Sequence, residues 1–442
     1  MTQQAAPMTE ESSLVIARIV RRLIPFLCLL FIVNYVDRTN VAMAKLRMLA
    51  DTGIDEGVYG LGAGLFFIGY FIFEVPSNLI LERVGARIWI TRIMISWGLI
   101  CAAMIFVRGP VSFFSLRFAL GVAEAGFFPG IVLYLTYWIP SSHRSGVMAW
   151  FLTSTAIAGF VGNPLAGALM KLDGVGGLHG WQWVFLVEGI APVLIGIVTP
   201  MLLTDRPSRA RWLTPTERDW IEQELARDEQ AHSHHHIADL RRALGNSRLW
   251  LLSILYFTLI MGLYGFIYWV PSIIQSTAPR MTEMTIGLFS AIPYSVAAIG
   301  MVLIGRHSDH RGERRWHIAV CALIGAAGIC LVTLCHSTPM VLLALCLAAI
   351  GIWGYLGPFW SLTTRCLRGG AAAGGIAIVN SIGALAGFVS PSIIGWAKRA
   401  TGSFTVGLLV VAGSLVCSAI LVIIVPKALD RSVRLDIIPR PS

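Results

Sequence analysis

Twelve blocks of apolar residues, each about twenty residues long, constrain this chain more than any other feature of its sequence. An apolar helix of that length crosses the hydrocarbon core of a bilayer. Only 13% of the residues are charged, too few to cover the surface of a water-soluble domain. The sequence therefore predicts an all-α membrane protein with twelve transmembrane helices, at approximately 23–44, 59–81, 88–107, 111–138, 146–170, 182–203, 249–273, 285–305, 316–335, 339–364, 371–394 and 403–425.

One long polar segment separates the sixth span from the seventh. It contains LTPTERDWIEQELARDE, which predicts an amphipathic helix capped by Thr214 or Thr216. We therefore expect three parts: an N-terminal six-helix bundle over residues 1–203, a cytoplasmic central loop over 204–248, and a C-terminal six-helix bundle with a cytoplasmic tail over 249–442.

The positions of the basic residues predict the orientation of the chain. The formal net charge is +10, and most of the 34 Lys and Arg fall on one side when successive spans alternate in direction. Because cytoplasmic loops carry the excess of Lys and Arg, we expect both termini in the cytoplasm of a multi-pass protein in a bacterial inner (plasma) membrane. The basic charge is then a topology signal, so we expect no nucleic-acid partner. We also expect a monomer.

The sequence lacks the motifs on which common enzyme chemistry depends. It has no phosphate-binding glycine loop after a strand, no zinc-ligand spacing and no nucleophile elbow. Its eight cysteines lie in or beside apolar blocks without a CxxC pair, which is typical of small core residues. We therefore expect no catalytic residues, no bound metal and no cofactor, and we predict that the chain is not an enzyme.

A short loop motif recurs at equivalent places in the two halves. An acid, two residues, Gly, one residue and Arg occur at Glu82–Arg87 after the second span and at Asp309–Arg314 after the eighth. Gly permits the tight turn, and the acid can pair with a helix end or an arginine. The motif resembles the signature of the major facilitator superfamily, with Asn78 and Glu82 where Gly and Asp are usual in the first copy. The resemblance covers essentially the whole chain and implies two pseudo-symmetric six-helix bundles around a central cavity.

Ionisable residues also occur well inside the predicted spans. A charge costs about 2.5–3.5 kcal/mol at the centre of a membrane helix, so such residues should face a cavity or one another. Glu74 and Glu188 lie towards the ends of their spans, and we interpret each as the partner of a nearby basic residue. The other four lie deeper: Asp37, Arg38, Arg117 and Glu124.

These four deeper residues suit a proton and anion relay. Arg117 and the Asp37–Arg38 pair lie at similar depth in the outer half, and Glu124 lies about 10 Å deeper than Arg117 on the same helix face. Arginine binds carboxylates with two parallel hydrogen bonds, and a carboxyl group in a dry cavity can gain and lose a proton. Symport of an anion with protons follows as a hypothesis, and a purely structural set of salt bridges is the alternative.

Three segments resemble a narrower family, the anion:cation symporters: NYVDRTNVAMA (34–44), GYFIFEVPSNL (69–79) and RFALGVAEAGFFPG (117–130). That family includes bacterial permeases for tartrate, galactonate, glucarate and phthalate. The resemblance implies proton coupling at Asp37 and Glu124 and anion binding at Arg38 and Arg117. It also adds four candidates for substrate binding: Tyr35, Tyr70, Trp360 and Asn380. Their side chains can bind hydroxyl groups or pack on a sugar face, but the same residue types also anchor helices at interfaces and join neighbouring helices.

The predicted function is proton-coupled import of a small organic anion, such as tartrate or another sugar acid, by alternating access. Its expected partners are a mono- or dicarboxylate, protons and the lipid bilayer. An anion exchanger or an efflux carrier on the same fold is the alternative. A non-transporting sensor is disfavoured, because the chain has no sizeable soluble domain to carry an output. In the tenth span, Gly351, Gly354, Gly357 and Pro358 predict a bend near Trp360.

Overall fold

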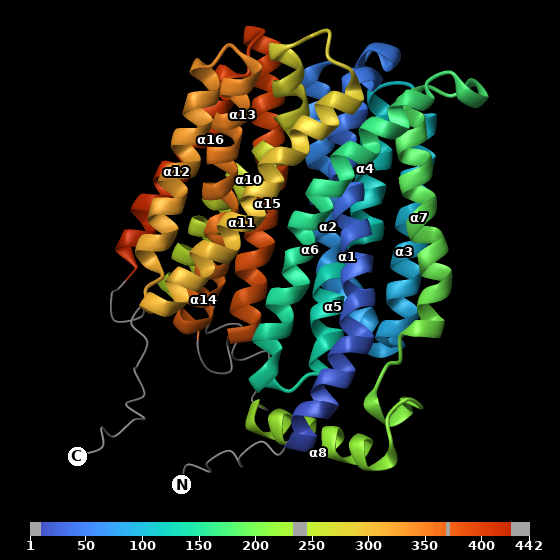
Figure 1. Cartoon of the computed structure of the whole chain (residues 1–442). Helices are drawn as coiled ribbons and strands as arrows, with labels where there is room; N and C mark the ends of the chain where they lie inside the picture. The colour runs from blue at the N-terminus through green and yellow to red at the C-terminus, as the bar shows by residue number, and fades with distance from the viewer. Residues whose placement is uncertain (1–9, 233–244, 368–371, 426–442) are drawn as a thin grey trace. The chain divides into compact units, whose positions relative to one another are not determined.

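A computed structural model describes residues 10–232, 245–367 and 372–425, and every regular element in those ranges is helical (Figure 1). Ten helical stretches in this part of the chain are long and apolar enough to cross a membrane. The first and fifth predicted spans fall in two further helices, so each of the twelve predicted spans coincides with observed helix. The predicted all-α, multi-pass membrane fold is confirmed.

The helices of the first half are α1 (Glu10–Thr52), α2 (Glu56–Val84), α3 (Ala86–Ala103), α4 (Pro110–Glu124), α5 (Phe127–Thr136), α6 (Ser141–Leu169) and α7 (Gly180–Leu202). The central segment contains α8 (Pro215–His232). The second half contains α10 (Ser247–Thr277), α11 (Glu283–Arg311), α12 (Arg315–Leu334), α13 (Thr338–Gly354), α14 (Leu356–Cys366), α15 (Ala372–Thr401) and α16 (Thr405–Ile424). Short 3-10 turns lie at Met104–Phe106, Met170–Leu172, Val175–Gly177 and Pro207–Arg209.

The chain forms two compact units, each of which we describe by itself. Unit 1 comprises Met1–Ile54, Leu65–Ser233 and Glu283–Gly287, and unit 2 comprises Asp55–Gly64, His234–Thr282 and Leu288–Ser442. The first turns of α2 and of α11 therefore belong to a different unit from the rest of each helix. Part of the predicted central loop and all of the predicted tail beyond residue 425 lie outside the described residues.

The same packing scheme occurs inside both units. In unit 1, α3 packs along α7, and α1 packs against α6 and α7. In unit 2, α12 packs along α16, and α10 packs against α15 and α16. These pairs correspond when the spans of each half are counted in order. Each half therefore folds as the same six-span arrangement, as the repeated loop motif predicts.

The two copies of the loop motif adopt the tight turn that their glycines predict. Gly85 and Gly312 both have positive φ, 97° and 65°. In the second copy Asp309 pairs with Arg314 at 2.6 Å. In the first copy the amide of Arg87, at the start of α3, donates to the carboxylate of Asp205 at 2.9 Å. A carboxylate at a helix N-terminus is favourable because it accepts from amides that have no partner within the helix.

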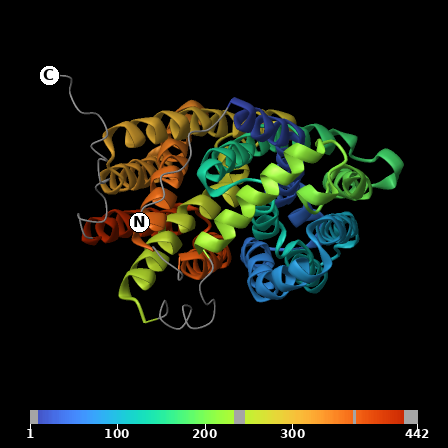
Figure 2. The same ribbon diagram turned by 90° about the horizontal axis from the view of Figure 1, so that it is seen from below.

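Both ends of the central helix α8 are bonded to other helices of unit 1. Thr214, one of the two predicted caps, forms a capping box with Glu217, in which each side chain accepts from the other residue's amide. Glu217 also pairs with Arg18 of α1 at 2.6 Å. Near the other end, Asp228 accepts from the amide and the hydroxyl of Ser141, at the start of α6. Figure 1 shows α8 beside the first turns of α1, and Figure 2 shows the ribbon from below, the side on which α8 lies.

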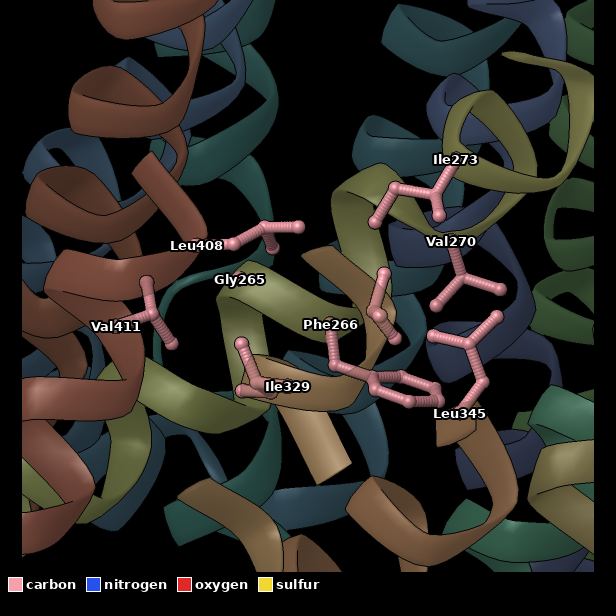
Figure 3. A pocket seen from close by; sticks show the side chains of 9 residues that line it. Gly265, Phe266, Val270, Ile273, Ile329, Leu345, Leu408 and Val411 are labelled. Atoms are coloured by element: carbon pink, nitrogen blue, oxygen red, sulfur yellow. The ribbon is translucent and has the colours of Figure 1, made fainter. Parts of the chain in front are cut away.

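An apolar cavity of about 10 Å³ lies inside unit 2 (Figure 3). Side chains of α10, α12, α13 and α16 enclose it: Gly265, Phe266, Val270, Ile273, Ile329, Val332, Leu345, Leu408 and Val411. The cavity is no larger than a water molecule requires, and none of these side chains offers a hydrogen bond. It is a packing gap, and none of the predicted substrate residues lines it.

Candidate substrate and proton site

The fourth predicted span is broken in the middle, directly after Glu124. Helix α4 ends at that residue, Ala125 is extended with ψ 133°, and Gly126 is left-handed with φ 83° before α5 begins. A Cβ atom on Gly126 would lie 2.4 Å from the hydroxyl oxygen of Ser77 on α2, so only glycine fits at this position. Interrupted membrane helices commonly mark binding sites, because their free backbone groups and terminal side chains face inward. Here the break fixes the carboxyl group of Glu124 at a helix end.

Glu124 holds Arg38 of α1 in a buried ion pair. Nε of Arg38 donates to Oε1 of Glu124 at 2.5 Å, and Nη2 contacts the same oxygen. The Glu124 side chain is fully buried, whereas 13% of the Arg38 side chain remains exposed. Separating a buried pair leaves an uncompensated charge, so the pair opens only if another anion or a proton takes the place of one partner.

Aromatic rings of α2 form the surroundings of this pair. The guanidinium carbon of Arg38 lies 5.2 Å from the ring centre of Tyr70 and 5.4 Å from that of Phe66. Arg117 of α4 is almost completely buried and lies 5.1 Å from the same Phe66 ring. Contact with an aromatic face stabilises a desolvated cation and orients its plane. Glu74 lies close enough to act electrostatically on Tyr70. The predicted residues Arg38, Arg117, Glu124 and Tyr70 therefore lie in one cluster.

Asp37 points to another part of unit 1, although it is adjacent to Arg38 in sequence. Its Oδ1 accepts from the side-chain amide of Asn40 at 3.0 Å. The same amide contacts the sulfur of Cys101 on α3 at 3.7 Å. Asp37 is 1% exposed, and it interacts electrostatically with Glu124 and Arg117 of α4. Adjacent residues on a helix diverge by about 100°, which explains why the two neighbours have separate partners.

Glu188 of α7 has surroundings that differ from those expected. We interpreted it as the partner of a nearby basic residue, but in the described part of the chain no basic side chain pairs with it. Its neighbours are Asp37 and Asn40 of α1, and neither of its carboxyl oxygens has a hydrogen-bond partner within ordinary distance. The residue is 5% exposed. The interpretation is therefore wrong for Glu188.

The remaining substrate candidates are Tyr35 in unit 1 and Trp360 and Asn380 in unit 2. Tyr35 is buried on α1, and its ring centre is 6.2 Å from that of Phe31. Trp360 of α14 and Asn380 of α15 belong to unit 2, and both are half-buried. The Trp360 ring packs edge-on against Tyr256 at 5.0 Å. Their part in substrate binding stays a prediction.

Two further polar residues of the site were not selected from the sequence. Asn40 and Cys101 join Asp37 to α3, yet a lone Asn and a lone Cys inside apolar spans usually serve packing. The available signal was the spacing of Asn40, which follows Asp37 by three residues and so lies on the same helix face.

A family model, two relatives and one solved structure match this chain. The sequence model of the Major Facilitator Superfamily matches residues 27–391. The chain is 46% identical over 424 residues to an Agrobacterium vitis protein named "Putative tartrate transporter", covering 95% of this chain and 93% of that protein. It is 42% identical over 417 residues to an Acinetobacter baumannii protein named "Quinolone resistance transporter", covering 94% and 96%. A solved bacterial homologue of the human lysosomal transporter Spinster matches with a TM-score of 0.71 over 93% of this chain and 95% of that chain; at 17% identity, this likeness concerns the fold alone.

Proposed function

The chain belongs to the major facilitator superfamily, a family of membrane transporters and not of enzymes, and from that premise we propose that it imports a small organic anion together with protons. The substrate class that we propose is a mono- or dicarboxylate such as tartrate or another sugar acid. The name of the Agrobacterium vitis relative supports this class.

The observation that carries the proposal is the buried pair of Arg38 and Glu124. An arginine that is permanently charged is held by a carboxyl group that can be neutralised by a proton. When Glu124 takes a proton, its attraction for Arg38 falls, and the guanidinium becomes available to a substrate carboxylate. When the substrate leaves, Glu124 can lose the proton and pair with Arg38 again. One site thus binds anion and proton in a linked way, which is what symport requires.

Two further residues of the same cluster support the proposed substrate site. Arg117, buried against Phe66, supplies a second positive charge in the same cluster as Glu124. The phenol of Tyr70, beside Arg38, is a hydrogen-bonding group that suits a hydroxyl of a sugar acid. We propose Arg38, Arg117 and Tyr70 as substrate-binding residues, and Glu124 and Asp37 as proton-binding residues.

The test is uptake by proteoliposomes that contain the purified protein. An inward proton gradient should drive accumulation of labelled tartrate or another sugar acid above its external concentration, and collapse of the gradient by a protonophore should end it. A panel of carboxylic acids as competitors would identify the substrate. Unchanged accumulation in the presence of the protonophore would contradict proton coupling.

Efflux of a drug in exchange for protons is the second candidate, and one observation favours it: the 42% identity to the protein named "Quinolone resistance transporter". The same vesicles separate the two functions. Import by symport requires anion and proton to move in the same direction, whereas efflux by exchange requires quinolone and proton to move in opposite directions. Quinolone movement against the proton gradient, without transport of any carboxylic acid in the panel, would replace our proposal with efflux.

A further inference from the structure

A second group of buried polar residues, two of them acids, lies where α1, α3 and α7 meet. It consists of Asp37 and Asn40 on α1, Cys101 on α3 and Glu188 on α7. Asp37, Asn40 and Glu188 are 1%, 2% and 5% exposed. The proposed exchange of partners at Arg38 and Glu124 makes no use of Glu188, so this acid needs a separate explanation.

The charges around the two acids do not neutralise both of them. Arg117 and Glu124 of α4 act electrostatically on Asp37, and Arg38 is held by Glu124. No basic side chain pairs with Glu188 in the described residues, and the next buried base along α1, Lys45, lies eight residues or about 12 Å from Asp37. An unpaired carboxylate in the membrane interior is costly, and two in one pocket also repel each other. The pair is therefore stable when it retains a proton.

Asn40 is placed to serve both acids. Its amide donates to Asp37, and Glu188 is its neighbour on the other helix. Cys101 fixes the cluster to α3, because its thiol contacts the Asn40 amide at 3.7 Å and the carbonyl oxygen of Phe185 on α7 at 3.6 Å. A proton on either carboxyl group is thus held within one small buried cluster of polar side chains.

The backbone around Glu188 is rigid, which directs the effect of ionisation towards α1. A Cβ atom on Gly189 would lie 2.4 Å from the amide nitrogen of Ala102, and one on Gly98 would lie 2.6 Å from the carbonyl oxygen of Gly189. Helices α3 and α7 are therefore in direct backbone contact. Repulsion between two ionised carboxyl groups would separate α1 from this pair of helices more easily than it would separate α3 from α7.

We propose that Asp37 and Glu188 form a second proton-binding site, in which the two carboxyl groups share one proton beside Asn40, and that loss of this proton loosens α1 from α7. This inference rests on the proposed proton coupling and extends it. Arg38 is also part of α1. The proton at this site therefore controls the position of the substrate-binding arginine through the helix that carries it. Glu188 is a positioning residue in this scheme, since it acts on Arg38 through α1.

Infrared difference spectroscopy tests the site without substrate and without a gradient. The protein in lipid is compared between acidic and alkaline buffer, and the signal is the carbonyl stretch of protonated carboxyl groups. Glu188→Gln should remove one such band and shift the pH midpoint of the Asp37 band. Asp37→Asn should shift the midpoint of the Glu188 band in turn, in each case by about one pH unit or more, because coupled sites titrate as a pair. Midpoints that do not respond to the other substitution would overturn the shared site.

Two controls keep this test decisive. Glu217→Gln, on α8 and outside the predicted spans, should leave both bands unchanged. Glu188→Asp keeps a carboxyl group and should keep a band whose pH midpoint still shifts with Asp37→Asn, so it carries the test if Glu188→Gln does not fold. Absence of the band from folded Glu188→Asp and from wild type would overturn the proposal.

A transport measurement then connects the site to coupling. Glu188→Gln should lower gradient-driven accumulation at least tenfold while it preserves exchange of labelled for unlabelled substrate. If Glu188→Gln accumulates substrate as wild type does, its role in coupling is refuted. If wild type itself shows no proton-driven uptake, the proposed symport fails, and the infrared midpoints still decide whether the two acids share a proton.

Discussion

At the scale of single residues, Glu124 combines full burial with a bonded arginine, and its substitution separates binding from coupling. Glu124→Gln removes the titratable group but keeps its size and one acceptor oxygen. We expect gradient-driven accumulation to be lost and exchange of internal for external substrate to persist. Both are measured with the same proteoliposomes. A variant that still concentrates substrate would place the transported proton elsewhere, with the pair of Asp37 and Glu188 as the next candidate.

Arg38 can be tested by a substitution that keeps its charge. Arg38→Lys loses the planar guanidinium, through which two nitrogens now contact Glu124. Hydrogen bonds to charged groups contribute about 1.5–3 kcal/mol, so the apparent KM should rise roughly ten- to a hundredfold.

Arg47→Lys is the matched control for Arg38→Lys. It changes an arginine of the same helix that pairs with Glu283 while its side chain is 65% exposed. It should change KM little, because an exposed pair contributes little. Equal effects of the two substitutions would show that Arg38 acts only as a local counter-charge.

The sequence located the charged residues inside the spans but did not predict which of them contact one another. Charge inside the predicted spans, together with depth, selected Asp37, Arg38, Arg117 and Glu124, because burial of a charge is costly. Depth estimates from straight helices placed Glu124 below the other three and did not predict its bond to Arg38. Glu188 was misinterpreted because the sequence does not show which face of its helix packs against α1.

At the scale of helices, the break after Glu124 depends on Gly126. Gly126→Ala combines the cost of a left-handed alanine, about 1–2 kcal/mol, with a contact to Ser77 that is too close. We expect a lower melting temperature in detergent and reduced uptake, because the carboxyl group of Glu124 would be displaced from Arg38.

Gly174→Ala is the control that isolates the steric part of this effect. Gly174 has nearly the same backbone, with φ 82°, but nothing lies within 4 Å of its Cβ position. It carries the conformational cost alone, so its variant should lose less stability and keep normal uptake. A Gly126→Ala protein as active as Gly174→Ala would show that the break does not position Glu124.

The sequence predicted the break in one of the two interrupted spans and missed the break in the other. In the tenth span, three glycines and Pro358 predicted a bend, and α13 does end at Gly354 before α14 begins at Leu356. The fourth span was expected to be continuous over 111–138. Gly126 is one of 44 glycines, and its close approach to Ser77 of α2 is a tertiary contact that the local sequence does not reveal.

At the scale of the whole molecule, the repeated packing of the two halves was predictable from the spacing of the apolar blocks and the repeated loop motif. The composition of the compact units was not. Residues Asp55–Gly64 group with unit 2 and Glu283–Gly287 with unit 1, although each begins a helix that continues in the other unit. Such grouping depends on tertiary contacts, which the order of residues along the chain does not show.

Several segments of unit 1 lie on one side of its helices, and this permits a test of orientation. Arg18, before the first predicted span, pairs with Glu217 of α8, and Ser141, before the fifth, bonds Asp228 of the same helix. The amide of Arg87, before the third, bonds Asp205, which follows the sixth. These segments are rich in Lys and Arg, so the positive-inside rule predicts that this side faces the cytoplasm.

Fusions to reporter proteins test that orientation for the full chain. Green fluorescent protein attached after residue 442 should fluoresce, and alkaline phosphatase attached there should be inactive, because each reporter matures on only one side of the bacterial inner membrane. Phosphatase inserted at Gly174, in the turn between α6 and α7, should be active, since that turn lies at the opposite end of the spans from Ser141. The reverse pattern would invert the topology. Asp51, at the far end of α1, would then face the cytoplasm, and Asp37 would lie in the inner half of the membrane instead of the predicted outer half.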